Sequence, residues 1–119
     1  MSSVTIYHNP KCSKSRGALA LLEERGVAHE TVRYLDEPPS RAALAEILRC
    51  IGGDPGELVR SGDSAFRQAG LELSASPGVD EVLDILVGHP ELMQRPVVIA
   101  GDRGVIARPP DRLLELLCD

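Results

Sequence analysis

The chain has 119 residues, of which 43% are hydrophobic and 26% are charged, and its formal net charge is −5. This composition excludes a disordered chain, and the length suits one domain, residues 1–119, with a hydrophobic core. The negative charge and the scarcity of aromatic residues, two Tyr, one Phe and no Trp, argue against a nucleic-acid surface, which needs cations and stacking side chains.

The first elements predict a parallel βαβ unit. Residues 4–7 are β-branched or aromatic, as in a short strand, and a helix-periodic segment follows Cys12. Arg25 and Gly26 are typical of a helix end, and residues 30–35 alternate as a second strand. A strand, a helix and a strand of these lengths form a right-handed parallel unit.

The middle of the chain, about residues 40–92, carries helical periodicity and no strand pattern. Ser40 is suited to cap a helix. The apolar side chains of that helix recur at helical spacing: Leu44, Ile47, Leu48 and Ile51. Shorter helical stretches are expected at 56–60 and 64–69. Ser76, followed by Pro77, is suited to cap a further helix. Its apolar stripe is Val79, Val82, Leu83 and Leu86.

Strand patterns return near the end of the chain. Residues 96–100 and 105–107 are apolar, and the Gly-containing turn at 101–104 between them predicts an antiparallel hairpin. Pro109 and Pro110 precede a final helix. Its inward side chains are expected to be Leu113, Leu116 and Leu117.

The assembled order predicts an α/β protein with a four-stranded mixed sheet flanked by helices. This is the plan of the thioredoxin-like fold, with a helical insertion at about 40–92 between the βαβ and ββα halves. In that plan a reactive cysteine follows the first strand, and a proline before the third strand faces it. Cys12 and Pro96 occupy these positions, so the Arg95–Pro96 peptide bond is expected to be cis.

Cys12 is the candidate nucleophile, because it lies where a strand gives way to a helix. Free N–H groups and the positive end of the helix dipole favour an anion at this place, and a thiolate is an anion. His8, Ser15 and Arg16 are polar or cationic neighbours that can add to the effect. The alternative for a single cysteine is a small buried hydrophobe, which polar flanks make a poorer fit.

Three arginines lie at the edges of predicted elements. Arg60 ends the short helix at 56–60, Arg95 precedes the strand-opening proline, and Arg108 follows the last strand. Taken singly, each could be a solvated side chain or part of a surface ion pair. Arg95 and Arg108 lie on consecutive strands and can converge. Guanidinium groups bind tetrahedral oxyanions through paired N–H donors.

With these residues in place, the sequence resembles the glutaredoxin-linked arsenate reductases, the ArsC-like proteins. The matching motifs run along the whole chain: Tyr7-His8-Asn9-Pro10, Cys12, Ser15-Arg16, Tyr34-Leu35, Pro38-Pro39, Glu57-Leu58-Val59-Arg60, His89-Pro90, Arg95-Pro96 and Arg108-Pro109. The resemblance implies a Cys12 nucleophile supported by His8, Ser15 and Arg16. It also implies that the three arginines bind arsenate or a similar oxyanion.

The same resemblance implies the partners of the reaction. Glutathione is the co-substrate, a glutaredoxin restores the thiol, and arsenate is reduced to arsenite for detoxification. No metal and no bound cofactor are expected, and the protein is expected to act as a monomer.

The N-terminal Met1-Ser2-Ser3 lacks a basic segment before an apolar stretch, and no run is long enough to cross a bilayer. A cytoplasmic protein without membrane association is therefore expected.

Two other functions remain open at the level of sequence. One is a thiol transferase acting on glutathionylated proteins, which needs Cys12 but not the three arginines. The other is a non-catalytic regulatory module, like relatives that bind RNA polymerase through a Cys-x-x-Cys switch, although Ser15 replaces the second cysteine here. The phosphatase type of reductase needs Arg six positions after its cysteine, where this chain has Ala18.

The remaining cysteines, Cys50 and Cys118, show neither metal-ligand spacing with Cys12 nor an even-numbered disulfide framework. In a reducing compartment, thiol chemistry is more often catalytic than structural. Cys50 lies beside the stripe of the second predicted helix and is expected to be a core or half-buried side chain. Neither cysteine is expected to be a required resolving thiol.

Overall fold

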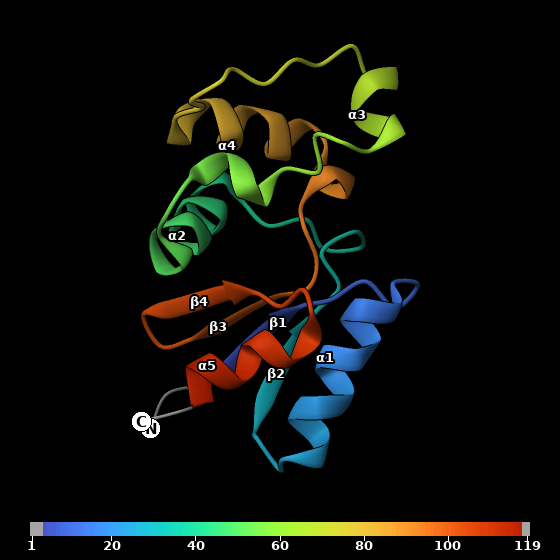
Figure 1. The fold of residues 1–119 in the computed structure, drawn as a ribbon, viewed down its shortest axis with the longest axis vertical. Coiled ribbons are helices and arrows are strands. Elements are labelled where there is room, and N and C mark those ends of the chain that lie inside the picture. Colours follow the sequence, from blue (N-terminus) through green and yellow to red (C-terminus); the bar gives the residue numbers. More distant parts are fainter. Residues whose placement is uncertain (1–3, 118–119) are drawn as a thin grey trace.

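A computed structural model describes residues 4–117 and contains one four-stranded mixed sheet, shown in Figure 1. The strands are β1 (Val4–Tyr7), β2 (His29–Val32), β3 (Val97–Ala100) and β4 (Arg103–Ile106), in the order β2-β1-β3-β4. Strand β1 pairs with β2 in parallel and with β3 antiparallel, and β3 pairs with β4 antiparallel. The expected parallel unit and hairpin are confirmed.

The first crossover is helix α1 (Ser13–Glu24), which buries Ser15, Ala18 and Leu22 against the sheet. Strand β2 is shorter than the expected strand at 30–35. The amide of His8 donates to the Val32 carbonyl oxygen at 2.8 Å. Beyond His8 the chain leaves the sheet and forms the loop that leads to α1. Without a partner beyond Val32, the chain turns, and the amide of Asp36 donates to the Arg33 carbonyl oxygen at 2.9 Å.

The helical insertion consists of α2 (Arg41–Ile51), η1 (Pro55–Leu58), α3 (Ser64–Gln68), α4 (Val79–Gly88) and η2 (Pro90–Leu92). The Ser40 hydroxyl accepts the amide N–H of Ala43 at 3.1 Å, which confirms the expected cap of α2. The expected cap of α4 at Ser76 is wrong, because Gly78 is the N-cap and no side chain caps this helix.

The expected helix ending at Arg60 also needs correction. Helix η1 stops at Leu58, and Val59 forms an isolated antiparallel bridge with Met93. The amide of Arg60 then donates to the Leu92 carbonyl oxygen at 2.7 Å. Arg60 is therefore fixed by pairing with a distant segment of the chain, which periodicity within a short window does not reveal.

The last part of the chain forms the hairpin, η3 (Pro110–Leu113) and α5 (Leu114–Leu117). Strand β4 begins at Arg103, because the turn needs only Gly101 and Asp102, and Gly101 has a positive φ of 64°. Leu113 is fully buried and Leu116 packs partly against the core. The expectations for the side chains of Leu117 and Cys118 lie outside the described residues.

The sheet separates two hydrophobic cores. One core packs the insertion against one sheet face and includes Tyr34 and Met93, and the other packs α1 and α5 against the opposite face (Figure 1). This arrangement confirms the four-stranded mixed sheet flanked by helices. The Arg95–Pro96 bond is cis, as expected, and the Arg108–Pro109 bond is also cis. Across residues 4–117, none of the helices has the length and hydropathy required to span a bilayer.

Candidate active site

The candidate site lies where β1 ends and α1 begins. Cys12 is the N-cap residue of α1 and has an extended backbone (φ −97°, ψ 124°). Its amide donates to the Asn9 carbonyl oxygen at 3.0 Å, which closes the connecting loop into a turn. The half-buried Cys12 side chain therefore lies at the positive end of the helix dipole.

The surroundings of Cys12 lower the pKa of its thiol. Burial opposes the thiolate, but hydrogen bonds from the Ser15 backbone N–H, the Arg95 side chain and the Lys14 backbone N–H together outweigh burial. Two of these donors belong to the first turn of α1, and the third comes from the loop before β3. The site therefore raises the fraction of reactive thiolate at neutral pH.

Ser15 uses its buried hydroxyl to hold the loop rather than the thiol. The hydroxyl oxygen accepts the Asn9 amide N–H at 2.9 Å and lies 2.6 Å from Nδ1 of His8. Burial and the charge of Arg33 lower the pKa of His8. A neutral imidazole can accept the hydroxyl proton at Nδ1, so His8 and Ser15 together fix the backbone that leads to Cys12.

Arg16 also acts on the loop. Its Nη1 donates to the Pro10 carbonyl oxygen at 2.9 Å, and its side chain is exposed. Among the hydrogen bonds of residues 4–117, none joins the Arg16 side chain to Cys12. The structure therefore gathers His8, Ser15 and Arg16 around the Cys12 loop as supports of its shape. Of these three residues, Ser15 alone lowers the pKa of the thiol directly, through its backbone N–H.

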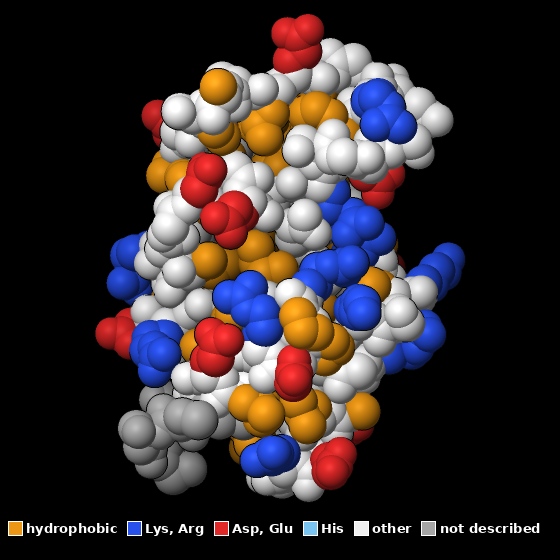
Figure 2. Space-filling model, viewed as in Figure 1, with side chains coloured by type: hydrophobic (Ala, Val, Ile, Leu, Met, Phe, Trp, Pro, Cys, Tyr) orange, Lys and Arg blue, Asp and Glu red, His pale blue; other side chains and the backbone are white. Residues whose placement is uncertain are grey.

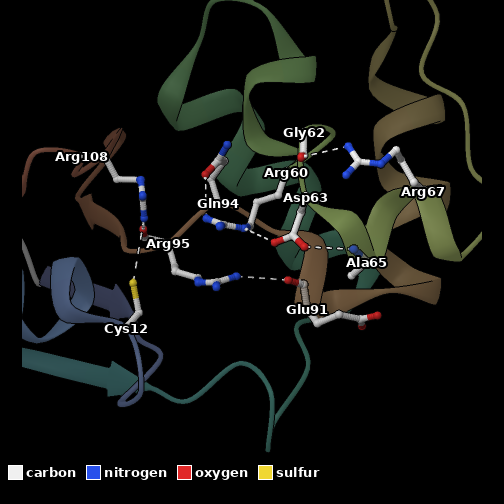
Figure 3. A network of polar contacts seen from close by, with 10 residues as sticks. All are labelled: Cys12, Arg60, Gly62, Asp63, Ala65, Arg67, Glu91, Gln94, Arg95 and Arg108. Atoms are coloured by element: carbon white, nitrogen blue, oxygen red, sulfur yellow. Dashed lines mark hydrogen bonds and ion pairs between the residues drawn. The ribbon is translucent and has the colours of Figure 1, made fainter.

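Figure 3 shows Arg108 reaching Cys12, and the Arg95 side chain extending beside them toward Glu91. Nη1 of Arg108 lies 3.9 Å from Sγ of Cys12 and donates to the Arg95 carbonyl oxygen at 2.9 Å. Nη1 of Arg95 donates to the Glu91 carbonyl oxygen at 3.3 Å. The Arg108 guanidinium thus contacts the sulfur, and the Arg95 guanidinium lies near enough to lower the pKa of the thiol. Two such groups on neighbouring loops can bind an anion beside the sulfur.

Arg60 lies farther along the same network, on the side of the insertion (Figure 3). Its Nε pairs with Oδ2 of Asp63 at 3.3 Å, and its Nη1 lies 3.4 Å from Oε1 of Gln94. The N–H of Ala65 and the Arg60 side chain lower the pKa of Asp63. The third arginine therefore joins the network without contacting Cys12, and a carboxylate already neutralises it.

Figure 2 shows the wider charge distribution on this face. Lys and Arg side chains gather across its middle, at the level where Figure 1 places the junction between the insertion and the sheet. Over residues 4–117, no cluster of three or more His, Cys, Asp or Glu side chains could hold a metal ion.

Sequence reasoning left three side chains out of the candidate site. Tyr34 is fully buried, and Cys12, Arg95 and Asn9 all influence the pKa of its phenol. Asp63 and Gln94 hold Arg60. The position of Tyr34 at the end of a predicted strand parallel to the first was a usable signal, because parallel strands end at the same edge. No local pattern marks Asp63 or Gln94.

Comparison with known proteins places the chain among described families. A model of the ArsC family matches residues 7–116. The chain is 38% identical over 120 residues to an arsenate reductase of Neisseria meningitidis, covering 98% of this chain and 100% of the relative. It is 39% identical over 115 residues to the uncharacterized protein YfgD of Escherichia coli, covering 96% of each.

A solved structure agrees with these relatives. The arsenate reductase from Vibrio cholerae superposes with a TM-score of 0.86 at 34% identity, covering 96% of this chain and 97% of that one. The similarity thus extends over the sheet, the insertion and the loops that carry the candidate site.

Proposed function

The chain belongs to the ArsC family, and on this premise we propose that it reduces arsenate to arsenite with glutathione as co-substrate and a glutaredoxin as partner. Cys12 is the nucleophile, and Arg95, Arg108 and Arg60 bind the oxyanion. His8, Ser15 and Arg16 support the Cys12 loop. The proposal needs no metal and no bound cofactor.

In the first step, the Cys12 thiolate attacks arsenic. Arsenate is an anion, so it repels the thiolate until cations neutralise its oxygens. Arg108 lies 3.9 Å from the sulfur, and Arg95 already favours the thiolate. Formation of the sulfur–arsenic bond expels one oxygen as hydroxide or, after protonation, as water. The product is a Cys12 adduct of pentavalent arsenic.

In the second step, a glutathione thiolate attacks the Cys12 sulfur. A disulfide forms between Cys12 and glutathione, and the electron pair of the broken sulfur–arsenic bond stays on arsenic. Arsenic becomes trivalent and leaves as arsenite, while two thiols are oxidised. The glutaredoxin thiolate then attacks the glutathione sulfur, and Cys12 leaves as a thiolate ready for another turnover.

One observation carries the proposal: a half-buried cysteine at a helix N-terminus, with a lowered pKa and two arginines at its sulfur. A buried structural cysteine needs no such set of donors. One cation beside the sulfur also serves a thiol transferase, because it favours the thiolate. A set of guanidinium groups is more than this needs and suits an oxyanion substrate.

The test is arsenite formation by the pure protein in the presence of glutathione and glutaredoxin. We expect turnover that needs both, is lost in Cys12→Ser and falls steeply in Arg108→Ala. A control reaction follows transfer of glutathione from a mixed disulfide. If only the transfer reaction is observed, the protein is a thiol transferase and the proposal is wrong. If Arg108→Ala keeps full arsenite formation, the role of Arg108 in binding arsenate is wrong.

A further inference from the structure

Two buried donors beside Cys12 have no acceptor in the structure. Oη of Tyr34 and Nε of Arg95 are each shielded from solvent, and neither forms a hydrogen bond with any partner among residues 4–117. Buried polar atoms are nearly always paired, so two unpaired donors in one site indicate an acceptor that arrives from outside. Nε–H of Arg95 can only donate, while the Tyr34 hydroxyl can accept as well as donate and still has its proton to give, so an electron-rich atom satisfies both groups.

The topology explains why Tyr34 belongs to this site. Tyr34 follows β2, and Cys12 follows β1, and these parallel strands end at the same edge of the sheet. The Tyr34 ring is fully buried in the core that also holds Leu92 and Met93, which precede Arg95. The ring is therefore held rigidly, and its hydroxyl is the polar end of a core side chain.

The groups around the Tyr34 hydroxyl are those of the candidate site. Burial raises the pKa of Tyr34, while the charge of Arg95 and the side chains of Asn9 and Arg95 lower it, and Cys12 raises it. The Asn9 and Arg95 side chains thus lie near enough to the hydroxyl to lower its pKa, but neither reaches it with the distance and angles of a formed hydrogen bond. The hydroxyl remains available as a donor.

We infer that the Tyr34 hydroxyl and the Arg95 Nε–H bind one oxygen of the oxyanion held at Cys12, which makes Tyr34 a substrate-binding residue of this site. This inference rests on the proposed function and adds a neutral donor to its cationic ones. Once the oxyanion is bound, a hydroxyl fixed by a buried ring keeps its place while charge develops on the oxygen, so it also stabilises the transition state.

The two donors are covered in the free protein, so the anion reaches them only if Arg95 moves. The hydrogen bond from Arg95 Nη1 to the Glu91 carbonyl oxygen is long, at 3.3 Å, and exposed. Exchange of this carbonyl oxygen for an anionic oxygen lets the guanidinium turn and uncover the hydroxyl. The exchange replaces a neutral acceptor by a charged one, which binds Arg more strongly.

Tyr34→Phe tests the inference, and Tyr7→Phe is the matched control, since Tyr7 is the other tyrosine of the chain. Tyr7 lines a separate cavity with Glu46 and Cys50. Each change is made in a Cys12→Ser background, in which arsenate binds without forming an adduct. The dissociation constant for arsenate is measured by calorimetry, and thermal unfolding is followed without ligand.

We expect Tyr34→Phe to weaken arsenate binding about tenfold, equivalent to about 1.4 kcal/mol, and to leave the ligand-free melting temperature unchanged or higher. The melting temperature does not fall because the lost hydroxyl has no partner among residues 4–117 of the free protein. Tyr7→Phe should leave arsenate binding unchanged.

The inference is overturned by unchanged arsenate binding in Tyr34→Phe. It is equally overturned if the variant unfolds or melts at a lower temperature, because the hydroxyl is then structural, or if the Cys12→Ser parent binds no arsenate. The two proposals can fail separately. If arsenate binding depends on Tyr34 but the protein with Cys12 intact does not reduce arsenate, the inference is supported and the proposed function is contradicted.

Discussion

The protein contains two described cysteines that have similar arginine contacts and opposite shifts of the thiol pKa. Nη1 of Arg108 lies 3.9 Å from Sγ of Cys12, and Nη2 of Arg49 lies 3.8 Å from Sγ of Cys50. The pKa of Cys12 is nevertheless lowered, whereas burial raises the pKa of Cys50. Distance to an arginine therefore does not by itself make a cysteine reactive.

The difference comes from the helix ends and from the counter-charge. Cys12 caps the N-terminus of α1, where backbone N–H groups are free, while Cys50 lies in the last turn of α2, where such donors are used up. Arg49 is also paired with Glu46, whose carboxylate oxygen lies 3.9 Å from the Cys50 sulfur. A carboxylate beside a thiol opposes its ionisation.

Replacing each cysteine gives the largest expected contrast. Cys12→Ser should reduce arsenite formation to background, because serine does not ionise at neutral pH and is a far weaker nucleophile. A Cys50→Ala, Cys118→Ala double variant should keep most of the turnover. The measurement is arsenite formation with glutathione and glutaredoxin, and loss of activity in the double variant would show that a second cysteine resolves the reaction.

The pH dependence of alkylation compares the two thiols directly. Only the thiolate reacts with iodoacetamide, so a lowered pKa moves the midpoint of the rate profile of Cys12 below pH 9.0, the ordinary value for the thiol. Burial moves the midpoint of Cys50 above the same value. At pH 7, Cys12 should therefore be modified first, as peptide mass spectrometry can determine. Faster modification of Cys50 would contradict the comparison.

Arg108→Lys tests the geometry of the cation rather than its charge. Nη1 of Arg108 contacts both Cys12 and the Arg95 carbonyl oxygen, which leaves the rest of the guanidinium fork for an oxyanion. Lysine keeps the charge but has one nitrogen and no fork. We expect kcat/KM for arsenate to fall roughly tenfold, the size of a lost charge-assisted hydrogen bond. The control is Arg49→Lys, which should leave kcat/KM unchanged. Equal losses in the two variants would argue against a specific role for Arg108.

Asp63→Asn probes the counter-charge on the candidate site and has the smallest expected effect. Asparagine can still cap α3 by accepting the Ala65 N–H, so the fold should be kept. The change removes the carboxylate that pairs with Arg60, which should lower KM for arsenate a few-fold, more at low salt than at high salt. A raised KM would show that Asp63 is needed to position Arg60.

Short-range patterns predicted much of the fold. The apolar stripe of α2, the cap at Ser40 and the turn at Gly101 each depend on neighbouring residues, and each was found. The ends of β2 and η1 were misjudged, since pairing with distant segments determines them. The single-domain organisation over residues 1–119, the monomeric state and the cytoplasmic location stay predictions.

The sequence by itself determined that Cys12 follows a strand and opens a helix, because strand and helix patterns extend over adjacent residues. Only the tertiary structure decided which arginines reach the sulfur, since Arg95 and Arg108 are brought to it by sheet pairing across more than 80 positions of the chain. It also placed the Tyr34 hydroxyl beside them, with no hydrogen-bond partner in the part of the chain that the structure describes. Such contacts depend on side chains that meet in space, and local propensity carries no information about them.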